Sequence, residues 1–586
     1  MTLKYGIIKN KFEFVLQHNQ HYVAGGNMSS NISKQKRERM MQFLSKLKEE
    51  HKDDDSMLIA LGEIEAELNT KKYGLVWEEH EEAVDIMMKD NIPVFTECVD
   101  KEIHASDSDN YNFLLEGDNL HSLHLLEKTH KGKIDVIYID PPYNTKNKDF
   151  IYDDCKIGEE DGYRHSKWIS FMAKRLRVAE KLLSPKGCIF ISIDDNEQAT
   201  LKMLCDEVFG EERFVALIPW RKRTAKSDVP FGISQDCESI LCYANSLFKA
   251  AVKGKERKYY ETSDFPNKPW RFHDLTTQRT IYERPNSNYT MVNPKTGEEF
   301  PVNPLRCWAI TKDTFKQYYD ENRVVFPGDY DFLNISKPVL RYWKEDDVKK
   351  AGADFGLVAV STYLPSEIVG MTQDGTKEIT ALFETKKFSF PKPISLIKYF
   401  LYISTVRDND VTILDFFAGS GTTAQAVLEL NKEDGGNRKF ILCTNNENGI
   451  CENITHQRIK TVITGKREDG SDYSEGIPAN LKYYRTDFVP KDEEYLSDAL
   501  LEHVAEMIQL EHGIKLDGKR YIMIMNDDEA DTLAEHWSEY PDVKALYVSK
   551  NVLFTTEQNA LFKDVDIHII PDYYFNFELR EVGETW

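Results

Sequence analysis

The sequence lacks any apolar run that approaches the roughly 20 uninterrupted residues of a membrane span. Its N-terminus also lacks the apolar core and small-residue cleavage site of a signal peptide. Cysteine is scarce: the 586 residues contain nine, and no two form a Cys-x-x-Cys pair. This spacing argues against a zinc knuckle and against a disulfide framework. We therefore expect a cytoplasmic protein with reduced, mostly buried cysteines, no metal site and no membrane contact.

The composition is that of an ordinary globular protein, with 41% hydrophobic, 30% charged and 12% aromatic residues. These fractions exclude collagen, a coiled-coil fibre and wholesale disorder. At the usual size of domains, the length is enough for about three or four of them.

The charge is unevenly distributed. The formal net charge is −23, which is unexpected for a protein that binds nucleic acid. Residues 486–586 carry 23 acidic and 8 basic residues, whereas residues 213–285 carry 14 basic and 8 acidic residues with interleaved aromatics. The basic middle is typical of a nucleic-acid interface, although a solvated basic face would have the same composition. The acidic end would serve either subunit contacts or solubility.

Apolar runs of strand length alternate with amphipathic helical patterns. Strands are expected at 134–139, 188–193, 411–414 and 440–443, and helices at 165–183, 197–209 and 454–462. This alternation predicts an α/β fold with a largely parallel sheet that helices cover on both faces.

Changes of pattern divide the chain into five parts. The predicted parts are a helical N-terminal extension (1–110), two α/β halves (111–245 and 386–485), an inserted domain (246–385) and a small acidic α/β domain (486–586). Met28 follows Gly25-Gly26-Asn27, which would result from translation of a ribosome-binding sequence, so Met28 is an alternative start and it stays open whether residues 1–27 are native.

A loop rich in small residues joins one predicted strand to a helix. Ala418, Gly419, Ser420 and Gly421 let the backbone turn tightly and approach a ligand at the carboxyl end of the strand. No Lys-Ser/Thr pair follows, so the loop is not a P-loop, and the third glycine of the dinucleotide motif is absent. Glu447 follows the next strand, where a carboxylate can bind ribose hydroxyls. The glycine loop alone is weak evidence, because such turns are often structural, and Glu447 alone would more often be a solvated loop residue.

The tetrapeptide Asp140-Pro141-Pro142-Tyr143 ends another predicted strand. Two prolines stiffen the loop, and Pro142 has no amide hydrogen to compete for the Pro141 carbonyl. The Asp140 carboxylate and that carbonyl could together accept both hydrogens of an exocyclic amino group. The Tyr143 ring offers a flat face for a base taken out of its stack.

These motifs together resemble the β class of amino-DNA methyltransferases, in which the catalytic tetrapeptide precedes the glycine motif. More closely, the sequence resembles the Mod (modification) subunits of type III restriction-modification systems. The resemblance rests on the following segments, which lie between about 110 and 465: Gly117-Asp118-Asn119-Leu120, Tyr138 to Thr145, Phe190 to Glu197, Asp206 to Gly210, Phe390-Pro391-Lys392-Pro393, Asp415 to Thr423 and Glu452 to Lys460. One departure is Gln235-Asp236-Cys237-Glu238, where relatives often have His-Glu, and it leaves the role of that turn open.

The resemblance implies a Rossmann-like, S-adenosylmethionine-dependent methyltransferase core with an inserted target-recognition domain. Asp at the start of the tetrapeptide favours adenine as the target, and no cysteine follows a proline as cytosine C5 methylation would require. The implied cofactor-binding residues are Asp118, Lys392, Asp415, Phe417, Ala418, Gly419, Ser420, Gly421, Thr422, Thr423 and Glu447. Asp140, Pro141, Pro142 and Tyr143 are the implied catalytic residues.

Candidate DNA contacts open the basic stretch: Arg221, Lys222, Arg223 and Lys226. The resemblance further implies double-stranded DNA as a partner, a homodimer, and a helicase-nuclease Res subunit. Three alternatives stay open: a solitary DNA methyltransferase, a catalytically inactive DNA- or nucleotide-binding module, and an RNA methyltransferase.

Overall fold

The computed structural model describes residues 32–52, 54–69, 77, 79–145, 151–152, 155–156, 164–224, 230–303 and 305–581. The chain divides into two units, residues 1–76 and residues 77–586. In the first unit, helices α2 (Ile32–Glu50) and α3 (Asp55–Asn69) pack against each other. Their contact buries Leu44 and Leu61. Residues 1–27, and with them Met28, lie outside the described residues.

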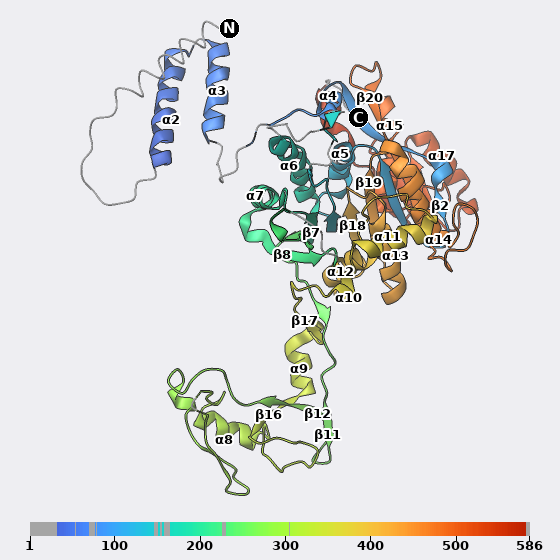
Figure 1. Ribbon diagram of the computed structural model, residues 1–586. Helices are drawn as coiled ribbons and strands as arrows, with labels where there is room; N and C mark the ends of the chain where they lie inside the picture. The colour runs from blue at the N-terminus through green and yellow to red at the C-terminus, as the bar shows by residue number, and fades with distance from the viewer. Residues whose placement is uncertain are drawn as a thin grey trace, which may run out of the picture. The chain divides into compact units, whose positions relative to one another are not determined.

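The second unit is built on a central sheet (Figure 1). Within the described part of the chain its ten strands are β1 (Asn91–Glu97), β2 (Ile103–His104), β3 (Tyr111–Glu116), β4 (Ile134–Ile139), β7 (Leu183–Ile193), β8 (Phe214–Arg221), β9 (Cys237–Ala244), β18 (Thr412–Asp415), β19 (Lys439–Thr444) and β20 (Asn480–Pro490). The order is β1-β20-β3-β19-β18-β4-β7-β9-β8, and β2 pairs with β20. Neighbours from β20 to β7 are parallel, and the outer pairs are antiparallel. The predicted parallel sheet is therefore confirmed in its centre.

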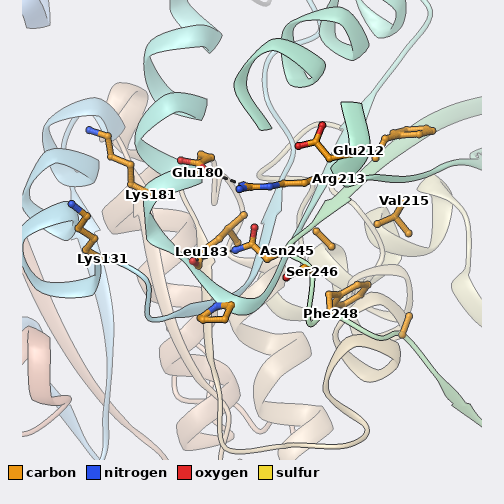
Figure 2. A pocket seen from close by; sticks show the side chains of 14 residues that line it. Lys131, Glu180, Lys181, Leu183, Glu212, Arg213, Val215, Asn245, Ser246 and Phe248 are labelled. Carbon is orange, nitrogen blue, oxygen red and sulfur yellow. Dashed lines mark hydrogen bonds and ion pairs between the residues drawn. The ribbon is translucent and has the colours of Figure 1, made fainter. Parts of the chain in front are cut away.

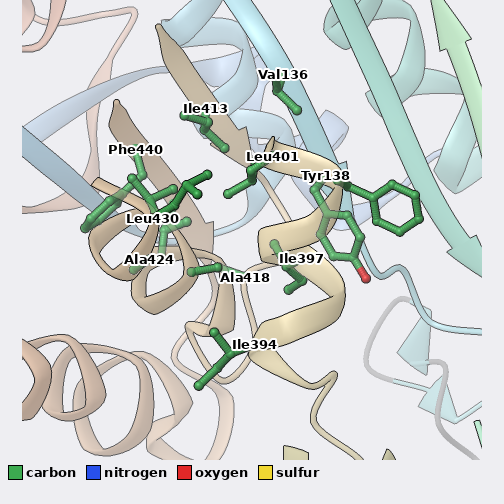
Figure 3. Packing of buried hydrophobic residues seen from close by; sticks show 14 of the residues in the cluster. Val136, Tyr138, Ile394, Ile397, Leu401, Ile413, Ala418, Ala424, Leu430 and Phe440 are labelled. Carbon is green, nitrogen blue, oxygen red and sulfur yellow. The ribbon is translucent and has the colours of Figure 1, made fainter. Parts of the chain in front are cut away.

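Two groups of helices cover the sheet. One group is α5 (Asn119–His130), α6 (Arg164–Leu182), α7 (Gln198–Phe209) and α16 (Val504–His512); the other is α10 (Ser366–Val369), α12 (Ile394–Thr405), α13 (Thr422–Asp434) and α14 (Gln457–Thr464). Within each group the helices contact one another. Because side chains alternate along a strand, Val136 and Tyr138 face α12 and α13, while Ile137 and Ile139 face the other way. Figure 3 shows the packing of Val136 and Tyr138 against α12 and α13.

The inserted region folds around its own small sheet. Its four antiparallel strands are β11 (Tyr260–Thr262), β12 (Phe265–Asp274), β16 (Val339–Trp343) and β15 (Val324–Val325). The shorter elements of the region are β10 (Val252–Lys253), β13 (Met291–Val292), β14 (Glu299–Phe300), β17 (Leu357–Val358), α8 (Lys312–Asp320), α9 (Lys344–Ala351) and α11 (Thr372–Phe383). β10 pairs with β17 where the chain leaves the core and returns to it. Each strand of this pair is only two residues long.

The C-terminal region contains a parallel three-stranded sheet, β21 (Tyr521–Ile524), β22 (Ala545–Val548) and β23 (Asp566–Ile569). Helices α17 (Asp527–Glu535) and α18 (Thr556–Leu561) accompany it. In the chain, α15 (Leu496–Leu501) precedes this sheet and contacts β20, and α19 (Asn576–Glu581) follows it. Among the residues that the structure describes, no helix is both long and apolar enough to cross a membrane.

Two predicted boundaries differ from the course of the sheet. The N-terminal part was expected to end at 110, but β1 and β2 already belong to the central sheet. The C-terminal part was expected to begin at 486, but β20 runs from Asn480 to Pro490, and its Thr486 pairs with Phe95 of β1. Helix α4 (Ala83–Asp90) leads directly into β1. β1 and β20 are far apart in the sequence, so neither strand alone indicates their antiparallel pairing.

Candidate active site

The predicted site residues converge at one edge of the central sheet. Because β3, β19, β18 and β4 are parallel neighbours, their carboxyl ends lie at the same edge. Asp118 follows β3, Glu447 follows β19, and the glycine loop follows β18. The Asp140 tetrapeptide follows β4, directly beside the glycine loop. The structure therefore places the two sequence motifs next to each other although about 270 residues separate them.

Hydrogen bonds on two sides hold the tetrapeptide loop. The Trp168 indole of α6 donates to the Pro142 carbonyl at 2.7 Å. Asn144 has a φ of 54° and donates its side-chain amide to the buried Glu197 carboxylate at 2.6 Å. His165 lies on the same Glu197 oxygen at 2.6 Å. These contacts hold the loop in one conformation before any substrate arrives.

A buried lysine joins the catalytic residues. The Lys392 ammonium donates to both carboxylate oxygens of Asp140, at 2.7 Å each, and to the Tyr143 hydroxyl at 2.8 Å. The Tyr143 hydroxyl donates towards Asp140 at 2.8 Å and towards Glu238 at 3.1 Å. Glu238 also pairs with Lys392 at 3.5 Å and with Lys222 at 3.1 Å. Two carboxylates and two ammonium groups therefore form one cluster.

Burial and charge shift the pKa values in this cluster in opposite directions. Burial disfavours the charged form of Lys392, but Asp140 and Glu238 outweigh it and raise the pKa of the ammonium. Burial likewise disfavours the charge of Glu238, but Lys392 and Lys222 lower its pKa below the usual range. Burial, followed by the charges of Asp140 and Glu238, raises the pKa of the Tyr143 hydroxyl well above its usual value. These shifts favour an ionised Glu238, a protonated Lys392 and a neutral Tyr143.

The cluster lies in the wall of a cavity of about 730 Å³. Its lining includes the whole tetrapeptide, Lys392, Glu238 and the aromatic rings of Phe388 and Phe390. Phe390 has a φ of 54° and is 74% exposed. The cavity therefore combines aromatic faces with a few hydrogen-bonding groups, as sites for planar heterocycles do.

A second cavity, of about 880 Å³, lies at the opposite edge of the sheet. Figure 2 shows the side chains that line it. It is lined by the start of β7, by Phe214 and Val215 of β8, and by the Arg213–Glu180 ion pair. None of the predicted site residues contributes to it. Its greater volume therefore does not make it the reaction site.

The glycine loop needs two residues with positive φ. Gly419 and Gly421 have φ values of 49° and 74°. A Cβ atom on Gly421 would lie 3.1 Å from Thr455, and one on Gly419 would lie 3.3 Å from the Phe388 ring. Both the conformation and the close neighbours therefore favour glycine at these positions.

A buried arginine supports the loop from below. Arg458 of α14 is fully buried and donates to the hydroxyl groups of Ser420, at 3.3 Å, and Thr422, at 2.8 Å. It also donates to Gln425 at 2.9 Å, and burial lowers the pKa of the guanidinium to about 10. The Ser420 and Thr422 hydroxyls thus bind Arg458, which indicates that these side chains shape the loop.

Asp415 ends β18 and ties the loop to the next helix. Its buried carboxyl group accepts hydrogen bonds from the Phe417 amide at 3.0 Å and from the Thr423 hydroxyl at 2.5 Å. Burial raises the pKa of this carboxyl group to about 7, in spite of those hydrogen bonds. The Ala418 amide donates to Cys443 of β19, so the loop is fixed on both sides.

The remaining predicted cofactor residues surround the loop. The Asp118 side chain, 40% exposed, caps α5 through the Leu120 amide at 2.7 Å and pairs with Arg175 at 3.2 Å. The Phe417 ring lies 6.0 Å from that of Phe171, and Glu447 is exposed beyond β19. A nucleoside with a cationic tail needs carboxylates for its hydroxyl groups and its charge, an aromatic ring for its base, and a glycine loop that lets it approach the backbone. All three are present here. The donor set therefore fits S-adenosylmethionine.

The predicted DNA contacts separate into different environments. Arg221 is exposed at the end of β8, whereas Lys222 lines the 730 Å³ cavity and pairs with Glu238. Arg223 donates to the Gln235 carbonyl at 3.2 Å. Lys226 lies outside the described residues. In the described part of the chain, no cluster of three His, Cys, Asp or Glu side chains could hold a metal ion.

The sequence reasoning missed three residues. Glu238 was noted only as a departure from a family pattern, and Trp168 and Arg458 were not assigned any role. Glu238 could have been found as an acidic residue at the start of a predicted strand, which is β9 in the structure and pairs with β7. No local pattern distinguishes Trp168 or Arg458 from other residues on amphipathic helices.

Comparison with known proteins identifies the fold family. The model of a family described as DNA methylase matches residues 134–456, which include both motifs and the region between them. The chain belongs to this DNA methylase family. The match covers the tetrapeptide, the inserted region, Lys392 and the glycine loop.

Individual relatives agree with this membership. The chain is 33% identical over 392 residues to the StyLTI type III restriction-modification Mod subunit of Salmonella typhimurium, covering 60% of this chain and 55% of the relative. It is 31% identical over 445 residues to the EcoPI Mod subunit of Escherichia phage P1, covering 65% of each. It is 33% identical over 358 residues to the type II methyltransferase M.KpnI of Klebsiella pneumoniae, covering 56% of this chain and 79% of the relative. The chain thus spans 55% and 65% of the length of these two Mod subunits.

Solved structures give a weaker likeness. The complex of M1.HpyAVI with S-adenosylmethionine has 14% identity and a TM-score of 0.28, covering 59% of this chain and 98% of that one. The cytosine-N4-specific PvuII methyltransferase has 12% identity and a TM-score of 0.29, covering 61% of this chain and 94% of that one.

Proposed function

We propose that the protein is a site-specific DNA methyltransferase that transfers a methyl group from S-adenosylmethionine to the exocyclic amino group of adenine. The observation that carries the proposal is the placement of the Asp140-Pro141-Pro142-Tyr143 loop beside the Gly419–Gly421 loop at one edge of the sheet. Membership of the DNA methylase family supports it. Asp at the start of the tetrapeptide favours adenine over cytosine.

The chain's own residues position the target base. Asp140 and the Pro141 carbonyl accept hydrogen bonds from the amino group, which draws its nitrogen lone pair out of conjugation with the ring. The Tyr143 ring stacks on the base, which has to leave the duplex to enter the 730 Å³ cavity. Transfer is then helped mainly by positioning and by electrostatic stabilisation. The nitrogen loses one proton afterwards, and the Asp140 carboxylate is within reach to accept it.

The residues around the glycine loop would bind the cofactor. Asp415 and Gly419 to Thr423 form the loop, Glu447 would bind the ribose, and Asp118 would lie near the methionine end. When bound, S-adenosylmethionine supplies an electrophilic methyl group on a positively charged sulfur. Lys392, which the resemblance places near the methionine end, contacts Asp140 in this structure.

We propose further that the protein acts in the cytoplasm as the modification and recognition subunit of a type III restriction-modification system. The StyLTI and EcoPI relatives, which are named as Mod subunits, support this assignment. A homodimer and a helicase-nuclease Res subunit would follow from it, with double-stranded DNA contacted by Arg221 and Arg223. The equal identity to M.KpnI favours, as a second candidate, a methyltransferase that does not depend on a Res subunit.

One experiment tests the reaction, the base and the type of system together. The gene is expressed in a host without DNA methylation, and the genomic DNA is sequenced by a single-molecule method that detects modified bases. Methyladenine in one short asymmetric motif, on one strand only, is the expected result. An Asp140→Ala variant should bind the cofactor and leave the genome unmodified; full methylation by that variant would refute the mechanism.

A further inference from the structure

One ammonium group serves two carboxylates in the catalytic cavity. Lys392 Nζ lies 2.7 Å from each oxygen of Asp140 and 3.5 Å from Oε2 of Glu238. The side chain of Lys392 is 9% exposed and that of Glu238 is 10% exposed. Water therefore screens the Lys392–Glu238 pair poorly, and the position of the ammonium decides which carboxylate is neutralised.

The observed position opposes capture of the target base. Asp140 has to accept a hydrogen bond from an uncharged amino group and draw electron density towards the methyl acceptor. An ammonium bound to both Asp140 oxygens competes for the same lone pairs, and it is the stronger, charged donor. Lys392 therefore has to leave Asp140 when the amino group arrives.

Glu238 is placed to receive the ammonium. Its Oε1 pairs with Lys222 at 3.1 Å, whereas its Oε2 faces Lys392 and the Tyr143 hydroxyl. A closer approach from 3.5 Å to the ~2.8 Å of an ordinary charged hydrogen bond completes the second pair. Two lysines and two carboxylates carry no net charge together, so the cluster as a whole stays neutral during the exchange.

We propose that Glu238 is a positioning residue that draws the Lys392 ammonium away from Asp140 and so frees this carboxylate for the amino group of the target base. The inference rests on the proposed function, because it assigns a role in the same cavity. Asp140 is then the residue that touches the substrate, and Glu238 acts through Lys392. Glu238 sets the preference for a base that carries an amino group.

The test compares two duplexes that contain the recognised sequence. One has adenine at the target position and the other has purine, which lacks only the amino group. Dissociation constants are measured with S-adenosylhomocysteine present, and single-turnover methylation of the adenine duplex is measured separately. The variants are Glu238→Gln, which keeps the shape of the side chain, and Glu238→Asp, which keeps its charge. Glu180→Gln is the matched control, since it breaks an ion pair at the opposite edge of the sheet (Figure 2).

Wild-type protein and Glu180→Gln should bind the adenine duplex more tightly than the purine duplex. Glu238→Gln should lose at least about ten-fold of this preference, equivalent to about 1.4 kcal/mol, and should slow single-turnover methylation at least as much. Glu238→Asp should restore part of the preference for adenine and part of the methylation rate. A purely structural role would weaken binding of the two duplexes equally and leave their ratio unchanged, which would overturn the inference.

Two further outcomes are distinguishable. If wild-type protein does not methylate the adenine duplex, the proposed function fails; if it does, and Glu238→Gln matches it, only the role of Glu238 fails. If Glu238→Gln does not fold, Lys392→Gln decides. That variant removes the competitor for Asp140, so the preference for adenine should persist, and its loss would refute the inference.

Discussion

The buried carboxyl group of Asp415 should make the stability of the fold depend on pH. Its pKa rises from 3.8 in the unfolded chain to about 7 in the folded protein because it is buried. Below both pKa values the group is protonated in the folded and the unfolded state, so the free energy of unfolding does not depend on its titration there. Between them the unfolded chain loses the proton and the folded protein keeps it, so the free energy of unfolding falls as pH rises. At 1.36 kcal/mol per pKa unit, the total loss above pH 7 is about 4 kcal/mol.

Asp415→Asn removes this titration while it keeps the hydrogen bonds. The amide oxygen can still accept from the Phe417 N–H, and the amide nitrogen can donate to the Thr423 hydroxyl. Relative to wild type, the variant should therefore gain up to about 4 kcal/mol between pH 4 and pH 8. Urea unfolding followed by tryptophan fluorescence across this range measures the difference. Asp528→Asn, an exposed change on α17, is the control, and parallel curves for Asp415→Asn and wild type would refute the reasoning.

Substitutions at three further positions, with one control at a fourth, test how the two loops work. Tyr143→Ala should weaken capture of the flipped base by about 1–3 kcal/mol, whereas Tyr143→Phe, which keeps the ring, should be milder in the same duplex-binding assay. Trp168→Phe removes the 2.7 Å hydrogen bond to Pro142 and should slow single-turnover methylation about five-fold at unchanged cofactor affinity, as calorimetry would verify. Gly421→Ala should weaken cofactor binding at least ten-fold, or about 1.4 kcal/mol. Gly435→Ala, at a similar φ of 70° but with open space around its Cβ position, should leave the dissociation constant unchanged.

The centre of the fold follows from local sequence patterns. The apolar runs at 134–139 and 440–443 are long enough for strands and correspond to β4 and β19. Asp140 follows the first run directly, and Asn445 follows the second after Thr444. Strands disfavour Asp and Asn, which placed the loops. The edge of the sheet does not follow in this way, because β1 and β20 pair across almost 400 residues and neither has a stronger apolar pattern than an exposed segment.

The same limit applies to the active site. Asp140 and the glycine loop were predictable because each is a contiguous motif with a chemical reason for its residue types. Lys392 was expected at the cofactor by resemblance alone, and its contact with Asp140 depends on how the segment before α12 packs. Gly375 of α11 fixes that packing, since a Cβ there would lie 2.3 Å from the Pro391 carbonyl. Such a contact exists only in the folded chain.

The charge cluster itself argues for function over stability. Removing Asp140, Glu238, Lys222 and Lys392 from water costs several kcal/mol per ion, and well-packed apolar residues of the same volume would stabilise the core at least as well. A fold that needed only a filled space would therefore not require four charges beside an open cavity. Shifted pKa values that come from specific charged partners in a cavity are typical of active sites. The cluster is thus best explained by a reaction in which one of its carboxylates has to exchange partners.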